Sequence, residues 1–126
     1  MNIIRLNSIK KLKLSSSNPI QDTKMICIST TSNCESTLKK ITSEVLGKKL
    51  SPCTHILKIH QSGYIWKGEI VYKPEFKLDI KTLNSCQKKI ITIIKKHHNY
   101  DVFELCVNRV NSANEQYDDW FNKQLK

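Results

Sequence analysis

Two side chains close together in the sequence have the chemistry to bind a metal ion. Cys53 and His55 are separated by one residue, so on a β-strand they point to the same face and can approach one ion. A thiolate suits copper or zinc, and imidazole is the commonest protein ligand for metals. A closed site needs three or four converging ligands, and no local cluster supplies them. We therefore expect a low-affinity site or one built across subunits, the alternative being that Cys53 only packs at the start of a strand.

The other histidines lie apart from this pair. His60 follows on the same predicted strand, whereas His97 and His98 stand at the end of a predicted helix. A protonated imidazole at a helix C-terminus compensates the helix dipole, and we interpret His97 in that way.

Signatures of enzyme chemistry are missing from the sequence. It contains no G-x-S-x-G motif and no phosphate-cradling glycine loop, and it has only three glycines in all. A nucleophilic cysteine–histidine pair meets only in space, and nothing in the sequence favours one. We predict that the protein is not an enzyme.

The composition is that of one small globular domain. The chain has 126 residues, of which 39% are hydrophobic and 25% are charged. No apolar run approaches the roughly 20 residues that cross a bilayer, so no membrane span is expected. The five cysteines are odd in number and widely spaced, which indicates reduced thiols and favours the cytoplasm.

Basic residues exceed acidic ones, giving a formal net charge of +10. Part of the excess comes from two lysine pairs that are seven residues apart and therefore lie on one side of a predicted helix: Lys88, Lys89, Lys95 and Lys96. A basic balance permits binding to nucleic acid or to an anionic membrane, but a solvated lysine-rich face explains the charge equally well, and we favour the second interpretation.

The N-terminal segment differs from the remainder of the chain. Residues 1–22 are basic, contain a run of three serines and show no sustained periodicity. We predict a flexible basic tail over 1–22 and one folded domain over 23–126. The tail is poor in acids, as organelle transit peptides are, but it holds one arginine only, so organelle targeting stays open.

Periodicity predicts an alternation of strands and helices from Lys24 onward. We expect a strand over 24–30, a helix that begins at a capping box of Ser32 and Glu35 and ends at Gly47, and β-structure over 53–81. Gly63 indicates a bulge or a close backbone approach. The chain is expected to turn near Lys73-Pro74.

The second half repeats the pattern. A helix is expected over 84–97, a strand over 102–110, and a terminal helix from a capping box of Ser112 and Glu115. The order is strand, helix, strand, strand, helix, strand, with one helix added. This is an α+β, ferredoxin-like βαββαβ fold with a long β-hairpin and an added C-terminal helix.

The hairpin is long compared with the helices. A strand over 54–66 extends about 40 Å at roughly 3.3 Å per residue, whereas the first helix covers only about 21 Å. The overhanging strands would expose unpaired edge amides, for which a neighbouring subunit is the simplest cover. We therefore expect self-association.

Five segments carry a resemblance to a known family. They are Leu50 to Ile56 around the cysteine, Tyr64 to Ile70 with its W-x-G-E-I signature, Glu75 to Thr82 ending in Lys-Thr, His98 to Glu104, which is similar to H-P-Y-E-V-P-E, and Tyr117 with Trp120 as Y-x-x-W. In this order and spacing they resemble the CutA divalent-cation tolerance family, over about 24–121. Asn99 and Phe103 depart from it, since the family usually has prolines there.

The resemblance implies a ferredoxin-like homotrimer whose long hairpins pair between subunits. It also implies tolerance of, or response to, divalent cations, with copper as a weakly bound or non-obligatory ligand. Matching positions imply metal ligands at Cys53 and His98, and His55 joins them as a candidate ligand because it shares a strand face with Cys53. Matching positions also imply a cleft between subunits formed by Trp66, Glu75, Lys81, Tyr100, Glu104, Tyr117 and Trp120. These aromatic and charged residues are otherwise explained as a polar-capped subunit interface.

Three other functions are weighed against metal tolerance. PII-type signalling proteins are also ferredoxin-like trimers and bind effectors between subunits, and a trimeric protein-interaction scaffold is a further alternative. RNA-recognition domains share the strand order, but they stack bases on aromatics of their first and third strands. Residues 25–31 contain no aromatic residue, so we predict no nucleic-acid partner.

Overall fold

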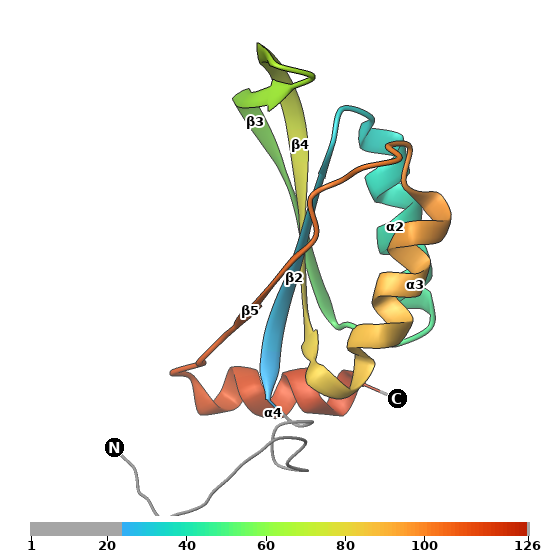
Figure 1. Cartoon of the computed structure of the whole chain (residues 1–126). Coiled ribbons are helices and arrows are strands. Elements are labelled where there is room, and N and C mark those ends of the chain that lie inside the picture. The colour runs from blue at the N-terminus through green and yellow to red at the C-terminus, as the bar shows by residue number, and fades with distance from the viewer. Residues whose placement is uncertain (1–23, 126) are drawn as a thin grey trace, which may run out of the picture.

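The computed structural model describes residues 24–125 and has the predicted βαββαβ order with an added helix (Figure 1). The elements are β2 (Met25–Ser32), α2 (Glu35–Gly47), β3 (Cys53–Trp66), β4 (Glu69–Leu83), the 3-10 helix η2 (Asn84–Cys86), α3 (Gln87–His97), β5 (Cys106–Arg109) and α4 (Glu115–Gln124). All strand pairs are antiparallel, in the order β3-β4-β2-β5. The predicted α+β, ferredoxin-like fold is confirmed.

The helices α2 and α3 lie side by side on one face of the sheet, and α4 lies across the end of the sheet far from the hairpin tip (Figure 1). The core fills the layer between the sheet and the α2–α3 pair. Its fully buried members are Ile28, Leu78 and Ile80 from the strands and Leu38, Ile41, Val45, Ile90 and Ile94 from the helices. Alternation on the strands and three- to four-residue spacing on the helices direct these side chains inward.

The first helix begins and ends at residues other than those predicted. Its N-cap is Cys34, and the Ser32 hydroxyl instead accepts a hydrogen bond from the Cys34 N–H at 3.0 Å. At the other end, the left-handed residue is Lys49, with φ of 56°, and not Gly47. The amides of Lys49 and Leu50 bond back to the carbonyls of Leu46 and Val45, both at 3.0 Å, which is a Schellman motif. The packing of Leu50 places the turn two residues beyond the glycine.

The hairpin turn also differs from the prediction. The chain reverses at Lys67-Gly68, where φ is 51° and 80°, as a two-residue type I′ turn requires. Pro74 lies inside β4 because a bulge shifts the register there: Ile59 is opposite Glu75, whereas Ser62 is opposite Lys73. A proline without an N–H is tolerated where the ladder is interrupted.

Gly63 fits the close approach that the sequence predicted. It is directly opposite Tyr72, and a Cβ atom at this glycine would lie 3.1 Å from the Tyr72 ring. The glycine therefore lets the tyrosine lie across the neighbouring strand.

The last strand and helix are shorter than predicted. Only Cys106–Arg109 of the predicted 102–110 strand is regular, paired with β2. The N-cap of α4 is Asn114 and not Ser112, because the Asn114 amide oxygen accepts hydrogen bonds from the N–H groups of Gln116 and Tyr117 at 3.0 and 3.3 Å. Asparagine is among the strongest N-cap residues.

The hairpin extends beyond the rest of the sheet (Figure 1). Strand β2 pairs with β4 only over Phe76–Leu83, so the Glu69–Glu75 part of β4 pairs with β3 alone. This is the overhang expected from the strand length. The predicted tail over 1–22 lies outside the described residues. Among the residues that are described, no helix is long and apolar enough to cross a bilayer.

Candidate functional site

Cys53 and His55 lie on the face of the sheet that α2 and α3 leave open. Cys53 is opposite Lys81 and His55 is opposite Asp79 on β4, whereas the alternate residues of β4, such as Ile80, enter the core. Burial and then a hydrogen bond with Cys53 raise the pKa of Tyr117 on α4 to about 12. The structure thus brings the predicted cysteine and histidine to one face, with α4 beside the cysteine.

A third ligand for one ion is not assembled within a single chain. The nearby Asp79 carboxylate accepts a hydrogen bond from the Ser29 hydroxyl at 2.7 Å and has the Lys77 ammonium at 3.7 Å. Over residues 24–125, no three histidine, cysteine, aspartate or glutamate side chains gather closely enough to hold a metal ion. Cys53 and His55 therefore offer two neighbouring donors and no closed site.

The third predicted ligand, His98, lies elsewhere. It contacts Thr31, which is opposite Lys77, four residues along β4 from the partner of Cys53. Four residues correspond to about 13 Å of strand. The chain therefore does not bring His98 to Cys53.

Both ring nitrogens of His98 are already engaged. Nδ1 accepts a hydrogen bond from the Tyr100 N–H at 3.0 Å, so Nε2 carries the hydrogen and donates to the Thr31 carbonyl at 2.9 Å. The ring stacks on Phe103 with centroids 4.2 Å apart. Burial lowers the pKa of His98, which stabilises the neutral imidazole that these bonds require.

Four of the predicted cleft residues do meet. Trp66, Glu75, Tyr100 and Glu104 line one groove of about 1050 Å³ between the overhanging part of the hairpin and the segment that leads into β5. Glu75 is only 6% exposed and accepts a hydrogen bond from the Tyr100 hydroxyl at 2.6 Å. Burial and this carboxylate raise the pKa of Tyr100, so the phenol stays protonated as the donor.

The other three predicted cleft residues lie at the opposite end of the sheet. Lys81 is opposite Cys53, and the rings of Tyr117 and Trp120 on α4 are tilted against each other with centroids 5.7 Å apart. Within one chain, the predicted cleft is therefore two separate groups, one along the overhanging hairpin and one beside Cys53.

Some groove residues were not singled out from the sequence. Lys73 lies over the Tyr64 ring, 5.8 Å from its centroid, and both line the groove together with Lys77. The alternation of Tyr64 with Trp66 on one strand face was a usable signal for Tyr64. The bulge determines that Lys73 lies on the same face of the hairpin as Tyr64. No sequence pattern gave the position of this bulge.

Comparisons with known proteins place this arrangement in a family. The family model for the CutA1 divalent ion tolerance protein matches residues 26–124. The divalent-cation tolerance protein CutA of Yersinia pestis (strain Pestoides F) is 31% identical over 108 residues, covering 86% of this chain and 91% of that protein. The chain belongs to the CutA1 divalent ion tolerance family, which confirms the resemblance seen in its motifs.

Solved structures show the same fold. CutA1 from Oryza sativa has 24% sequence identity and a TM-score of 0.76, with 84% of this chain and 97% of that chain covered. The protein from Archaeoglobus fulgidus described as periplasmic divalent cation tolerance protein CutA has 24% identity and a TM-score of 0.75, with 81% and 99% covered. Because that relative is described as periplasmic, the cytoplasmic location of the present chain stays a prediction.

Proposed function

We propose that the protein supports tolerance of divalent cations by binding them weakly, copper first, as a homotrimer without enzymatic activity. The observation that carries the proposal is membership of the CutA1 family over residues 26–124. Two features of the chain support the details: a hairpin with exposed apolar side chains, and two metal donors on the open face of the sheet.

The hairpin supports self-association. Its exposed apolar side chains include Ile65 (74% exposed), Ile70 (68%) and Tyr72 (65%). A monomer that exposes such a group of large apolar residues on an overhanging strand pair is prone to association. A neighbouring copy covers both the apolar side chains and the free strand edges, and three copies follow from the family resemblance.

The donors support copper at a site shared between copies. Cys53 supplies a thiolate and His55 an imidazole, and both ligand types suit copper. Each chain contributes two donors, so the remaining ligands come from water or a second copy. His98 joins such a site only if a metal displaces its hydrogen bonds to Thr31 or Tyr100.

A copper competition titration of the reduced protein tests this assignment. We expect Cys53→Ser to weaken copper binding by at least about tenfold, since it removes a first ligand, and His55→Asn to weaken it less. We expect His98→Asn to leave the copper affinity near that of the parent, because both ring nitrogens of His98 are already bonded to Thr31 and Tyr100. The matched control is Cys86→Ser, which removes a thiol at the end of the 3-10 helix η2. Unchanged affinity in Cys53→Ser contradicts the site.

A second candidate function is effector binding at the groove of Trp66, Glu75, Tyr100 and Glu104. Its volume of about 1050 Å³ and its mixture of aromatic and charged lining favour a small ligand. A thermal shift with a nucleotide but none with copper favours this candidate over metal binding.

A further inference from the structure

The positive charge of the described chain is concentrated on one layer. The α2–α3 layer, residues 34–49 and 84–98, carries eight lysines in four adjacent pairs: Lys39-Lys40, Lys48-Lys49, Lys88-Lys89 and Lys95-Lys96. The layer has two carboxylates, Glu35 and Glu44, so its net charge is +6. The remainder of residues 24–125 has eight basic and eight acidic side chains and is neutral. This layer covers one face of the sheet, and Cys53 and His55 lie on the other face.

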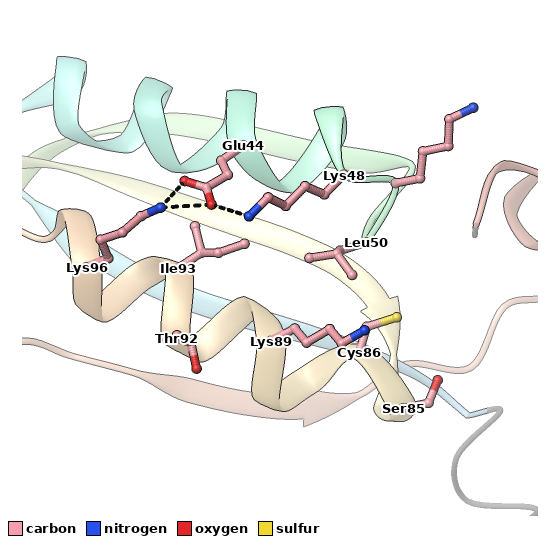
Figure 2. Close-up of a pocket in the computed structure, with 10 residues that line it drawn as sticks. Glu44, Lys48, Leu50, Ser85, Cys86, Lys89, Thr92, Ile93 and Lys96 are labelled. Carbon is pink, nitrogen blue, oxygen red and sulfur yellow. Dashed lines mark hydrogen bonds and ion pairs between the residues drawn. The ribbon is translucent and has the colours of Figure 1, made fainter.

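A groove runs between the two helices of this layer (Figure 2). Its volume is about 850 Å³, within the range of small-molecule sites. Four lysines line it, Lys48, Lys49, Lys89 and Lys96, together with the hydroxyl residues Ser85 and Thr92. Leu50 and Ile93 supply its apolar part. Cations with hydroxyl groups around a concave surface favour a compact anion over a flat partner.

One carboxylate partly neutralises the groove. Glu44 is 2.8 Å from the Lys48 ammonium and 2.7 Å from that of Lys96, and Figure 2 shows both lysines reaching it from the two helices. Lys49 and Lys89 have no carboxylate within 4.0 Å among the described residues. In the part of the chain that the structure describes, Lys49 and Lys89 therefore stay without a carboxylate partner, beside two lysines that an arriving anion can share with Glu44.

The chemistry of the lining selects the class of anion. The layer holds no arginine and no aromatic residue, so it has neither the planar forks that read base edges nor a platform on which bases stack. Lysines act as point charges toward phosphate oxygens. Several of them around one groove match a ligand with more than one phosphate.

We propose that the groove between α2 and α3 binds a soluble oligophosphate through Lys49 and Lys89, with Lys48 and Lys96 shared between Glu44 and the ligand. This goes beyond divalent-cation tolerance, because the groove shares no residue with the Cys53 face. Membrane lipids and nucleic acids present the same phosphate chemistry, but a bilayer surface or a duplex is too large to enter the groove.

Calorimetric titration of the full chain with tripolyphosphate at low ionic strength tests the proposal. Lys89→Gln is expected to weaken binding about two- to fivefold, the factor for one exposed charge pair, and Lys89→Arg to restore it. The matched control is Lys88→Gln, the same change on the adjacent exposed residue, which does not line the groove. Glu44→Gln is expected to strengthen binding because it frees two lysines and removes a repelling carboxylate.

Three results overturn the proposal. The first is the absence of a tripolyphosphate signal in the folded protein. The second is an equal loss in Lys88→Gln and Lys89→Gln, which means that diffuse charge and not the groove attracts the anion. The third is binding to phosphatidylserine vesicles or duplex DNA that exceeds tripolyphosphate binding and does not change in Lys89→Gln. None of these readouts involves copper, so they are independent of the metal assignment.

Discussion

The Tyr100 hydroxyl donates a hydrogen bond to the buried Glu75 carboxylate at 2.6 Å and also accepts one from the Asn33 N–H at 2.9 Å. This tyrosine therefore joins the loop after α3 to β4 and to the end of β2. It also lines the groove along the overhanging hairpin.

Replacing Tyr100 by phenylalanine is expected to destabilise the protein. The change removes a donor from a carboxylate that is 6% exposed and leaves the Asn33 N–H without its partner. The loss in the free energy of unfolding is about 1–3 kcal/mol, measured by urea denaturation. Tyr72→Phe is the matched control, because that side chain is largely exposed. Equal losses in the two variants contradict the role given to the Tyr100 hydroxyl.

Acid stability is expected to depend on Glu44. The ammonium groups of Lys48 and Lys96, followed by His97, lower the pKa of Glu44 from 4.5 to about 2. The stabilisation by the carboxylate is therefore complete above about pH 4.5 and is lost as the pH falls toward 2, where the folded protein takes up the proton. Thermal midpoints measured between pH 7 and pH 2 should fall less steeply in Glu44→Gln, which starts from a lower midpoint at pH 7. Parallel curves for the two proteins contradict this linkage.

Lys49→Gly is expected to stabilise the fold. Lys49 has φ of 56° at the end of α2, a conformation that costs a residue with a Cβ roughly 1 kcal/mol more than glycine. Chemical denaturation should show a gain of about that size. Lys48, with φ of −87°, gives the control: Lys48→Gly should not stabilise the protein. If Lys49→Gly also weakens tripolyphosphate binding, the lysine is kept in a strained position for its charge.

Cys34 is expected to be the most reactive of the five thiols. Hydrogen bonds with Ser36 and then Thr37 lower its pKa to about 7, so at neutral pH about half of it is the nucleophilic thiolate. Timed iodoacetamide labelling at pH 7, followed by peptide mass analysis, should find Cys34 modified first and slowed by Ser36→Ala. Faster labelling of Cys106, the exposed cysteine, is the contrary result.

The sequence predicts the elements of this fold well because burial imposes periodicity. Ile26, Ile28, Leu78 and Ile80 alternate along their strands because one face meets the helices, and that alternation is visible in the printed sequence. The errors fall where a local signal competes with packing. Pro74 resembles a turn residue, but the bulge opposite it allows the strand to continue to Lys67-Gly68.

The candidate site was predicted only in part, because residue types do not give the register of strands. Cys53 and His55 share a face by spacing alone, so their juxtaposition was predictable. The sequence did not show that His98 lies far from Cys53, because the distance between them depends on the pairing of β2 with β4. It also did not show that both ring nitrogens of His98 are bonded, to Thr31 and to Tyr100. The groove between α2 and α3 depends on how the two helices pack against each other. The lysine spacing on α3 predicted a basic face on that helix, but it did not predict that Lys48 and Lys49 would lie across from it.

Native mass spectrometry of the reduced protein, with and without copper, tests copper binding by a homotrimer because it reports subunit number and bound metal together. We expect a trimer that gains copper, and a Cys53→Ser trimer that does not retain it. A monomer contradicts the role of the overhanging hairpin. A trimer that takes up no copper, or whose copper is unaffected by Cys53→Ser, contradicts the metal site.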